Sequence, residues 1–220
     1  MDLSSLIKEI NNQKNLIHLR PLNVFTPNGI DPKTVIHIAG DIGKTSLALE
    51  CVYRNSNKLF LYVDTYFKIK NEETADNMYL FRTNNMNDII LYLNELNPKD
   101  FDFIIIDSLQ NLSFSEELEG NMNNYITGRY ILFQNSLIKI LNKCSDLNIP
   151  LILLNTLKDD GKPFNLSIQL LYQYSMDLRI ESLIKKGDYY YLAINSQKNV
   201  YRTYDTPTNN NIILLGKGDD

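Results

Sequence analysis

Two glycines, a lysine and a hydroxyl residue stand close together at Gly40, Gly43, Lys44 and Thr45, between an apolar run and a run with helical spacing. The backbone N–H groups of a glycine-rich turn can point at phosphate oxygens, and the N-terminus of the next helix adds a positive dipole end. A lysine at this place reaches the outer phosphates, and a threonine hydroxyl can hold Mg²⁺. The spacing therefore predicts a phosphate-binding loop for a nucleoside triphosphate with Mg²⁺.

This loop departs from the usual spacing, G-x-x-x-x-G-K-S/T. Ile38 stands where the first glycine is expected, and if Gly40 takes that role the loop is two residues short. Because a short motif also occurs by chance, a tight strand-to-helix turn with an exposed lysine is the alternative interpretation. On the nucleotide interpretation, the contacts come from Gly40, Asp41, Ile42, Gly43, Lys44, Thr45 and Ser46.

A second candidate is Asp107, which follows the apolar run at 103–106 directly. A buried parallel strand that ends in a carboxylate places it at the carboxyl edge of the sheet, where ligands bind in open α/β folds. There Asp107 can hold the Mg²⁺ together with Thr45, directly or through water. Many buried strands end in aspartate, so the pattern alone is weak. It becomes more specific here because it follows Lys44-Thr45 with two strands and two helices between them.

The composition favours a folded chain without a membrane segment. Of the 220 residues, 44% are hydrophobic, which is enough for a sizeable core. The net charge of −4 disfavours a protein that coats nucleic acid by charge alone. Cys51 and Cys144 lack metal-ligand spacing and are predicted to be buried thiols. His18 and His37 are isolated and are predicted to pack in the core or on the surface. With no signal-peptide pattern and no bilayer-length apolar run, we expect an intracellular protein, cytoplasmic or associated with the nucleoid.

Strands and helices are predicted to alternate along the chain. The strands lie before residue 40 and at 58–65, 78–82, 101–107, 151–156, 176–181, 188–195 and 212–215, and the helices at 3–14, 45–54, 87–96, 125–147 and 168–174. A hairpin turn is expected at 185–188. The order predicts an α/β fold with a mainly parallel central sheet, flanking helices and an antiparallel edge. We expect an N-terminal helix or arm over 1–20 and one core over 21–220.

The order and spacing of these segments resemble the ATPase core of the RecA/RadA recombinase superfamily over roughly residues 24–204. The segments that carry the resemblance are IHIAGDIGKTSLALE, LYVDT, FIIIDSLQNL, LILLNT, YSMDLRIESLIKKGD and INSQKNV. The chain is similar to minimal forms of this superfamily, such as bacteriophage RecA-like single-strand annealing proteins and the archaeal RadB group. The resemblance implies a P-loop ATPase core that uses ATP and Mg²⁺.

The resemblance also implies partners. It suggests action in DNA recombination, repair or single-strand annealing. The expected ligand is single-stranded DNA, and the expected protein partner is either further copies of this chain, in an oligomer or filament, or a RecA-like paralogue. The DNA-binding loops would correspond to 113–124 and 158–167, where Lys158 and Lys162 are the candidate contacts. Lys198 and Arg202 would reach across a subunit interface. No membrane partner is expected.

Two positions depart from the superfamily pattern. Tyr66 stands where the catalytic glutamate is expected, and Thr156 where the sensor glutamine is expected. A phenol with a pKa near 10 is a poor base at neutral pH, so hydrolysis is expected to be slow. Two other functions stay open: a non-catalytic paralogue that serves as a structural or assembly subunit, and a circadian-type or signalling ATPase of the same fold.

Overall fold

The computed structural model describes residues 16–112, 122–156, 175–186, 189–197 and 209–217. Its centre is an eight-stranded sheet with the strand order β3-β2-β4-β5-β1-β6-β7-β8. The strands are β1 (Val35–Ala39), β2 (Phe60–Asp64), β3 (Met78–Arg82), β4 (Phe103–Asp107), β5 (Leu151–Asn155), β6 (Ser175–Lys186), β7 (Tyr189–Gln197) and β8 (Asn209–Lys217). Strands β1 to β6 are parallel, whereas β7 and β8 pair antiparallel. The predicted α/β fold with an antiparallel edge is confirmed.

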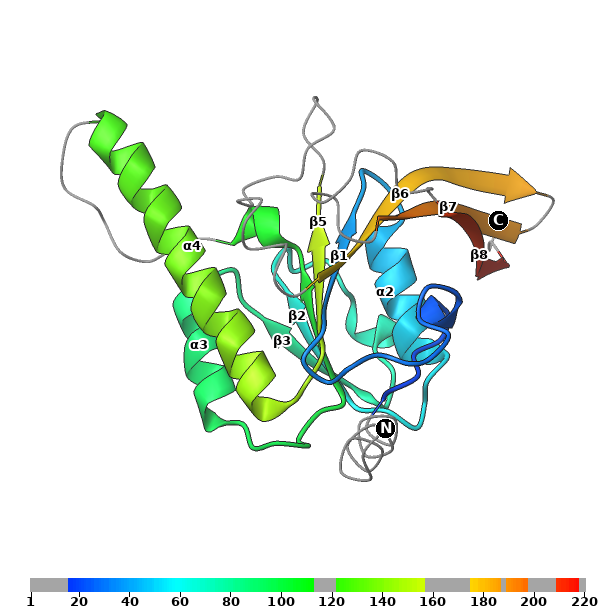
Figure 1. Cartoon of the computed structure of the whole chain (residues 1–220), viewed down its shortest axis with the longest axis horizontal. Coiled ribbons are helices and arrows are strands. Elements are labelled where there is room, and N and C mark those ends of the chain that lie inside the picture. The colour runs from blue at the N-terminus through cyan, green and yellow to red at the C-terminus, as the bar shows by residue number, and fades with distance from the viewer. Residues whose placement is uncertain (1–15, 113–121, 157–174, 187–188, 198–208, 218–220) are drawn as a thin grey trace, which may run out of the picture.

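Helices cover both faces of the sheet (Figure 1). Helix α2 (Lys44–Tyr53) lies on one face, and α3 (Met86–Glu95) and α4 (Met122–Leu147) lie on the other. In the described connections lie three short 3-10 helices, η1 (Leu22–Val24), η2 (Asn71–Glu73) and η3 (Leu109–Asn111). Helices α2 and α3 each begin within one residue of their predicted starts at residues 45 and 87.

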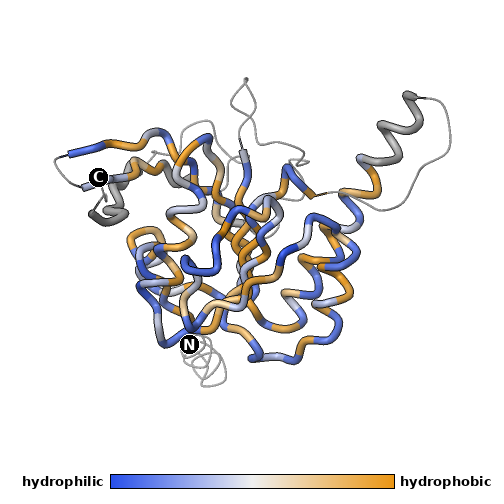
Figure 2. Tube along the Cα trace, turned by 180° about the vertical axis from the view of Figure 1, so that it is seen from behind, coloured by the Kyte–Doolittle hydropathy of each residue, from blue (hydrophilic) through white to orange (hydrophobic). Residues whose placement is uncertain are grey.

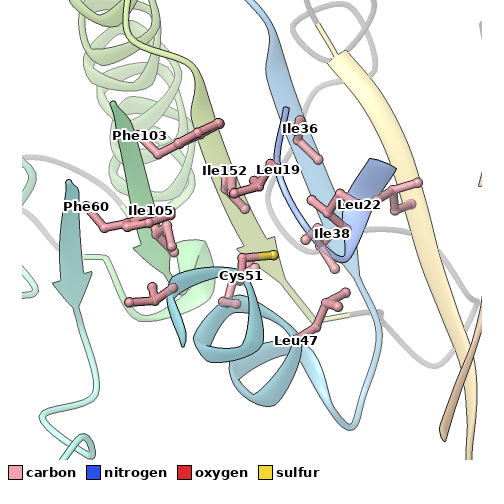
Figure 3. Packing of buried hydrophobic residues seen from close by; sticks show 14 of the residues in the cluster. Leu19, Leu22, Ile36, Ile38, Leu47, Cys51, Phe60, Phe103, Ile105 and Ile152 are labelled. Carbon is pink, nitrogen blue, oxygen red and sulfur yellow. The ribbon is translucent and has the colours of Figure 1, made fainter. Parts of the chain in front are cut away.

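Each central strand is buried on both faces, which explains its continuous apolar sequence. All five residues of β1, β2, β4 and β5 are buried. Successive side chains point to opposite faces, so Ile36 and Ile38 join the core under α2, and Val35 joins the core under α3 and α4. Figure 2 shows the apolar centre of the sheet, and Figure 3 shows the α2 core around Leu47 and Cys51.

The antiparallel edge is longer than the sequence predicts. Strand β6 continues to Lys186, five residues beyond the predicted end, and β8 extends the predicted 212–215 on both sides. The predicted turn at 185–188 is wrong in its first half, because Lys185 pairs with Tyr190 and Lys186 with Tyr189. Cross-strand pairing therefore extends β6 through exposed residues. Exposed residues do not show the apolar pattern from which strands are predicted. The predicted helices at 3–14 and 168–174 lie outside the described residues.

His37 packs, as predicted, but it also has a polar partner. Its Nδ1 lies 2.9 Å from Oδ1 of Asp177 on β6, and Arg179 Nε lies 3.4 Å from the other carboxylate oxygen. Burial pushes the pKa of Asp177 upward, but the hydrogen bonds and charges of His37 and Arg179 outweigh it, and the net pKa is lowered. This pair fastens β1 to β6 beside the phosphate-loop candidate.

The cysteines behave as predicted. Cys51 on α2 and Cys144 on α4 are both buried free thiols. Burial raises the pKa of both, that of Cys144 to about 12, so neither is a reactive thiolate at neutral pH. Within the described ranges, no helix combines the length and apolar character that crossing a bilayer requires.

Candidate nucleotide-binding site

The loop between β1 and α2 starts at Gly40. Ile38 is paired with Leu154 inside the sheet, so it cannot serve as the first loop residue. Strand β1 ends at Ala39, and α2 begins at Lys44. Residues 40–43 therefore form the whole loop, two residues short of the usual motif, and the second of the two sequence alignments is the one the fold adopts.

Both loop glycines lie close against the β6–β7 hairpin. A Cβ on Gly40 would lie 2.9 Å from Cβ of Ile180, and one on Gly43 would lie 2.5 Å from Cδ2 of Leu192. Gly43 also has a φ of 74°, a left-handed conformation that favours glycine. The glycines thus have a structural reason in addition to any phosphate contact.

Lys44 lies at the N-terminus of α2, with its ammonium directed back over the loop. Its Nζ donates a hydrogen bond to the carbonyl oxygen of Gly40. Burial lowers the pKa of Lys44, while the nearby charges of Asp107 and Asp41 act in the opposite direction. The first N–H groups of a helix have no acceptor within it, so those of Lys44, Thr45 and Ser46 are available to an acceptor outside α2. This end of α2 can therefore receive an anion.

Thr45 and Asp107, the two predicted Mg²⁺ ligands, are in contact. The Thr45 hydroxyl donates to Oδ2 of Asp107 over 2.6 Å, and the Tyr62 hydroxyl donates to the same oxygen over 2.8 Å. Burial raises the pKa of Asp107, the two hydrogen bonds oppose this rise, and the charge of Asp64 adds to it. The carboxylate is thus buried, oriented by two hydroxyls and poorly solvated.

Replacing Asp107 with asparagine should stabilise the nucleotide-free chain at neutral pH by ~1 kcal/mol, because a buried, poorly solvated charge is removed. The pKa of Asp107 is raised in the fold, so its favourable contribution is complete below the ordinary value of 3.8 and is lost as pH rises through the folded value. Urea unfolding from pH 4 to 8 should therefore show a smaller loss of stability in Asp107→Asn. Asp146→Asn, at an exposed position on α4, is the control. Identical pH curves for Asp107→Asn and wild type would contradict this assignment.

Tyr62, which sequence reasoning missed, holds Asp107 from the neighbouring strand β2. Its ring is fully buried, and burial, the charge of Asp107 and the hydrogen bond to it raise the pKa of Tyr62 well above its ordinary value. The hydroxyl therefore stays protonated and keeps donating. The only hint in the sequence is a tyrosine in an otherwise apolar strand, since the contact depends on the β2–β4 pairing.

Gln110 connects the two positions that depart from the superfamily pattern. Its Nε2 donates to the Tyr66 hydroxyl over 2.5 Å, and its Oε1 accepts from the Thr156 backbone N–H over 2.9 Å. The Lys68 ammonium lies 4.5 Å from the centre of the Tyr66 ring. One amide therefore ties together the ends of β2, β4 and β5. Sequence reasoning missed Gln110; its one signal is a polar side chain three residues after Asp107.

Asp64, the other carboxylate at this edge, has a structural role. Its oxygens accept hydrogen bonds from the backbone N–H groups of Tyr66, over 3.1 Å, and Ile69, over 2.9 Å. It is almost completely buried. These bonds shape the chain after β2 and leave Asp64 poorly placed to act as a base.

The remaining predicted contacts cannot be placed. Lys158, Lys162, Lys198 and Arg202 lie outside the described residues, as does residue range 113–121 of the first expected DNA-binding loop. Among the residues that the structure describes, no group of three or more histidine, cysteine or acidic side chains could hold a metal ion by itself. A Mg²⁺ at Thr45 and Asp107 would accordingly take further ligands from the phosphates and water.

No family model and no curated protein matches the sequence. Among solved structures, the chain is similar to the RadB recombinase, with a TM-score of 0.59 and 20% identity over 84% of this chain and 89% of that one. At this identity the likeness concerns the fold alone. The chain therefore shares the fold of the RadB recombinase.

Proposed function

We propose that this chain binds ATP with Mg²⁺ at residues 40–46 and Asp107, and acts as a RecA-like protein in DNA recombination, repair or single-strand annealing. The observation that carries this proposal is the 2.6 Å contact of Thr45 with Asp107, next to Lys44 at the N-terminus of α2. A recombinase, RadB, shares the fold. These features lie at the carboxyl edge of the sheet, the usual place of ligands in open α/β folds.

The residues present fit Mg²⁺. A hydroxyl and a carboxylate are the oxygen ligands that Mg²⁺ accepts, and Mg²⁺ commonly keeps several waters beside one or two protein ligands and the substrate phosphates. Bound there, the ion would neutralise phosphate charge. Thr45 and Asp107 would hold it, and Lys44 would turn from the Gly40 carbonyl to the phosphates. With four loop residues instead of six, fewer backbone N–H groups surround the phosphates, so we expect modest affinity.

Slow hydrolysis follows from the surroundings of Tyr66. Its phenol takes the place expected for a carboxylate, and Gln110 donates a hydrogen bond to it. Asp64 is held by two backbone N–H groups. Within the described ranges, this edge of the sheet thus has no carboxylate in a good position to activate water. We therefore expect bound ATP to remain unhydrolysed for many seconds.

A second candidate is a non-catalytic subunit that supports the assembly of a RecA-like partner. Three features favour it: Gly40 and Gly43 lie close against β6 and β7, Lys44 already has an acceptor in the Gly40 carbonyl, and Tyr66 stands where a catalytic carboxylate is expected. Each is compatible with a loop that has kept its shape for structural reasons. The two candidates differ in whether nucleotide changes the state of the protein.

Size-exclusion chromatography with light scattering, with and without Mg-ATP and single-stranded DNA, tests the proposal. We expect larger assemblies with both ligands, because aligned subunits repeat weak cationic contacts along one strand. Lys158→Ala with Lys162→Ala should weaken DNA binding without changing the response to nucleotide, and Lys198→Glu should reduce both assembly and DNA binding. An ATP-bound oligomer that ignores DNA at low salt would favour the assembly subunit instead.

A further inference from the structure

The outer end of the antiparallel edge extends past α2 (Figure 1). There the register aligns residues of three strands in one row: Lys186 of β6 lies opposite Tyr189 of β7, which lies opposite Lys217 of β8. In the next row but one, Ile184 lies opposite Tyr191. Directly paired residues of antiparallel strands share a face, so Lys186 and Tyr189 stand on the same face as Ile184 and Tyr191.

This face is the one turned away from α2. Leu192 belongs to the core under α2 and packs against Gly43, and side chains alternate along a strand. Tyr189 and Tyr191 are therefore on the opposite face from Leu192. Lys185 and Tyr190 share the α2 side, where the ammonium lies 5.4 Å from the ring centre.

The face is accessible. Tyr189 is 43% exposed and Ile184 is 40% exposed, while Lys186 is exposed and Tyr191 is half-buried. A large aromatic ring with this exposure, next to an exposed aliphatic side chain, leaves apolar surface in water at the end of a strand. The exposed cation Lys186 stands directly beside it, on a chain whose net charge is −4.

We propose that Ile184, Lys186, Tyr189 and Tyr191, here called the tyrosine platform, bind single-stranded nucleic acid. Aromatic rings give bases a surface for stacking, and lysines neutralise the adjacent phosphates, the combination by which proteins bind single strands without sequence preference. Residues two apart on a strand are separated by ~6.6 Å, which allows two successive bases to meet two rings. A duplex keeps its bases stacked internally and cannot use the rings, so the platform favours single strands.

The platform deepens the proposed function and rests on it, because it gives the expected DNA partner a binding surface made of described residues of β6 and β7. Its residues lie outside residues 40–46 and Asp107, so single-strand binding can be measured without ATP. Failure of nucleotide binding at Lys44 and failure of the platform are therefore distinguishable: the first is measured by thermal shift with Mg-ATP, and the second by DNA binding without nucleotide.

Fluorescence anisotropy with a labelled oligothymidylate, and with a duplex of equal length, provides the test. We expect Tyr189→Ala to weaken single-strand binding about tenfold, the scale of losing one stacked base, and Tyr189→Phe to keep it within about twofold. Lys186→Ala should lower the slope of log affinity against log salt by about 0.7, the value for one phosphate of a single strand. Tyr130→Ala and Lys139→Ala, on α4, are matched controls, since Tyr130 is also 43% exposed.

Three results would overturn the platform. They are wild-type affinity in both Tyr189→Ala and Lys186→Ala, an equal loss in the α4 controls, and equal or tighter binding of the duplex. If Tyr189→Ala folds poorly, the other two variants still test the platform. Tyr189→Phe keeps the ring, and the salt slope of Lys186→Ala does not involve the ring.

Discussion

Replacing Lys44 with alanine should abolish the thermal stabilisation that Mg-ATP gives the wild-type chain. A ligand that binds only the native state adds RT ln(1 + [L]/Kd) to stability, about 2.7 kcal/mol at a hundredfold excess over Kd. For a chain of this size, that corresponds to a rise in Tm of roughly 5–10 °C. The Lys44 ammonium is the one cation that the described part of the loop offers to the outer phosphates, so its loss should remove most of the shift.

The control for this experiment is Lys33→Ala, which removes an exposed lysine just before β1 and should leave the shift intact. EDTA should reduce the shift in the wild type, because Thr45 and Asp107 act through the ion. Wild-type protein that melts identically with and without a set of saturating nucleotides would exclude the nucleotide site. The short loop would then be a strand-to-helix turn, held by the packing of Gly43 against Leu192.

Introducing glutamate at Tyr66 should raise ATP turnover about 10²–10⁴-fold over a slow wild type, the usual range for a general base. The substitution places a carboxylate at the end of β2, beside the strand end that carries Asp107. Lys68, whose ammonium now lies over the Tyr66 ring, would keep that carboxylate ionised. Phosphate release measured in single turnovers, with and without single-stranded DNA, gives the rate of the chemical step.

Tyr66→Phe is the matched control, since it keeps the ring under Lys68 and removes only the hydroxyl that Gln110 contacts. No gain in rate is expected from it. Fast, DNA-stimulated hydrolysis by the wild type, lost in Asp107→Ala and unchanged by substitutions at Tyr66, would show that another acid does the work. Glu116, Glu117 and Glu119, in the segment outside the described residues, would be the next candidates.

The parts of the fold that the sequence predicts well are those where local pattern and burial agree. Strand β4 is a continuous apolar run because both its faces are covered, and Asp107 at its end marks the sheet edge. Helix α2 follows from the glycine turn and apolar spacing, and β3 has the predicted bounds. In each case, the sequence pattern that marks the element lies within a few residues along the chain.

The contacts that the sequence does not predict are those made between strands far apart in the chain. Tyr62 meets Asp107 across 45 positions, and His37 meets Asp177 across 140. Such pairs depend on strand order and register, which no local pattern encodes. The choice between Ile38 and Gly40 as the start of the loop likewise needed the pairing of β1 with β5.

The packing of Leu192 against Gly43 connects the phosphate-loop candidate to the tyrosine platform through strand β7. Leu192 and Tyr189 are three residues apart, about 10 Å along a strand that pairing on both sides keeps stiff. A loop that closes on phosphates would press on Leu192 and so tilt the end of β7 that carries Tyr189. Linkage is reciprocal: the factor by which nucleotide alters affinity for a single strand is the factor by which the strand alters affinity for nucleotide. Leu192→Ala would then uncouple the two ligands, leaving each to bind as if the other were absent.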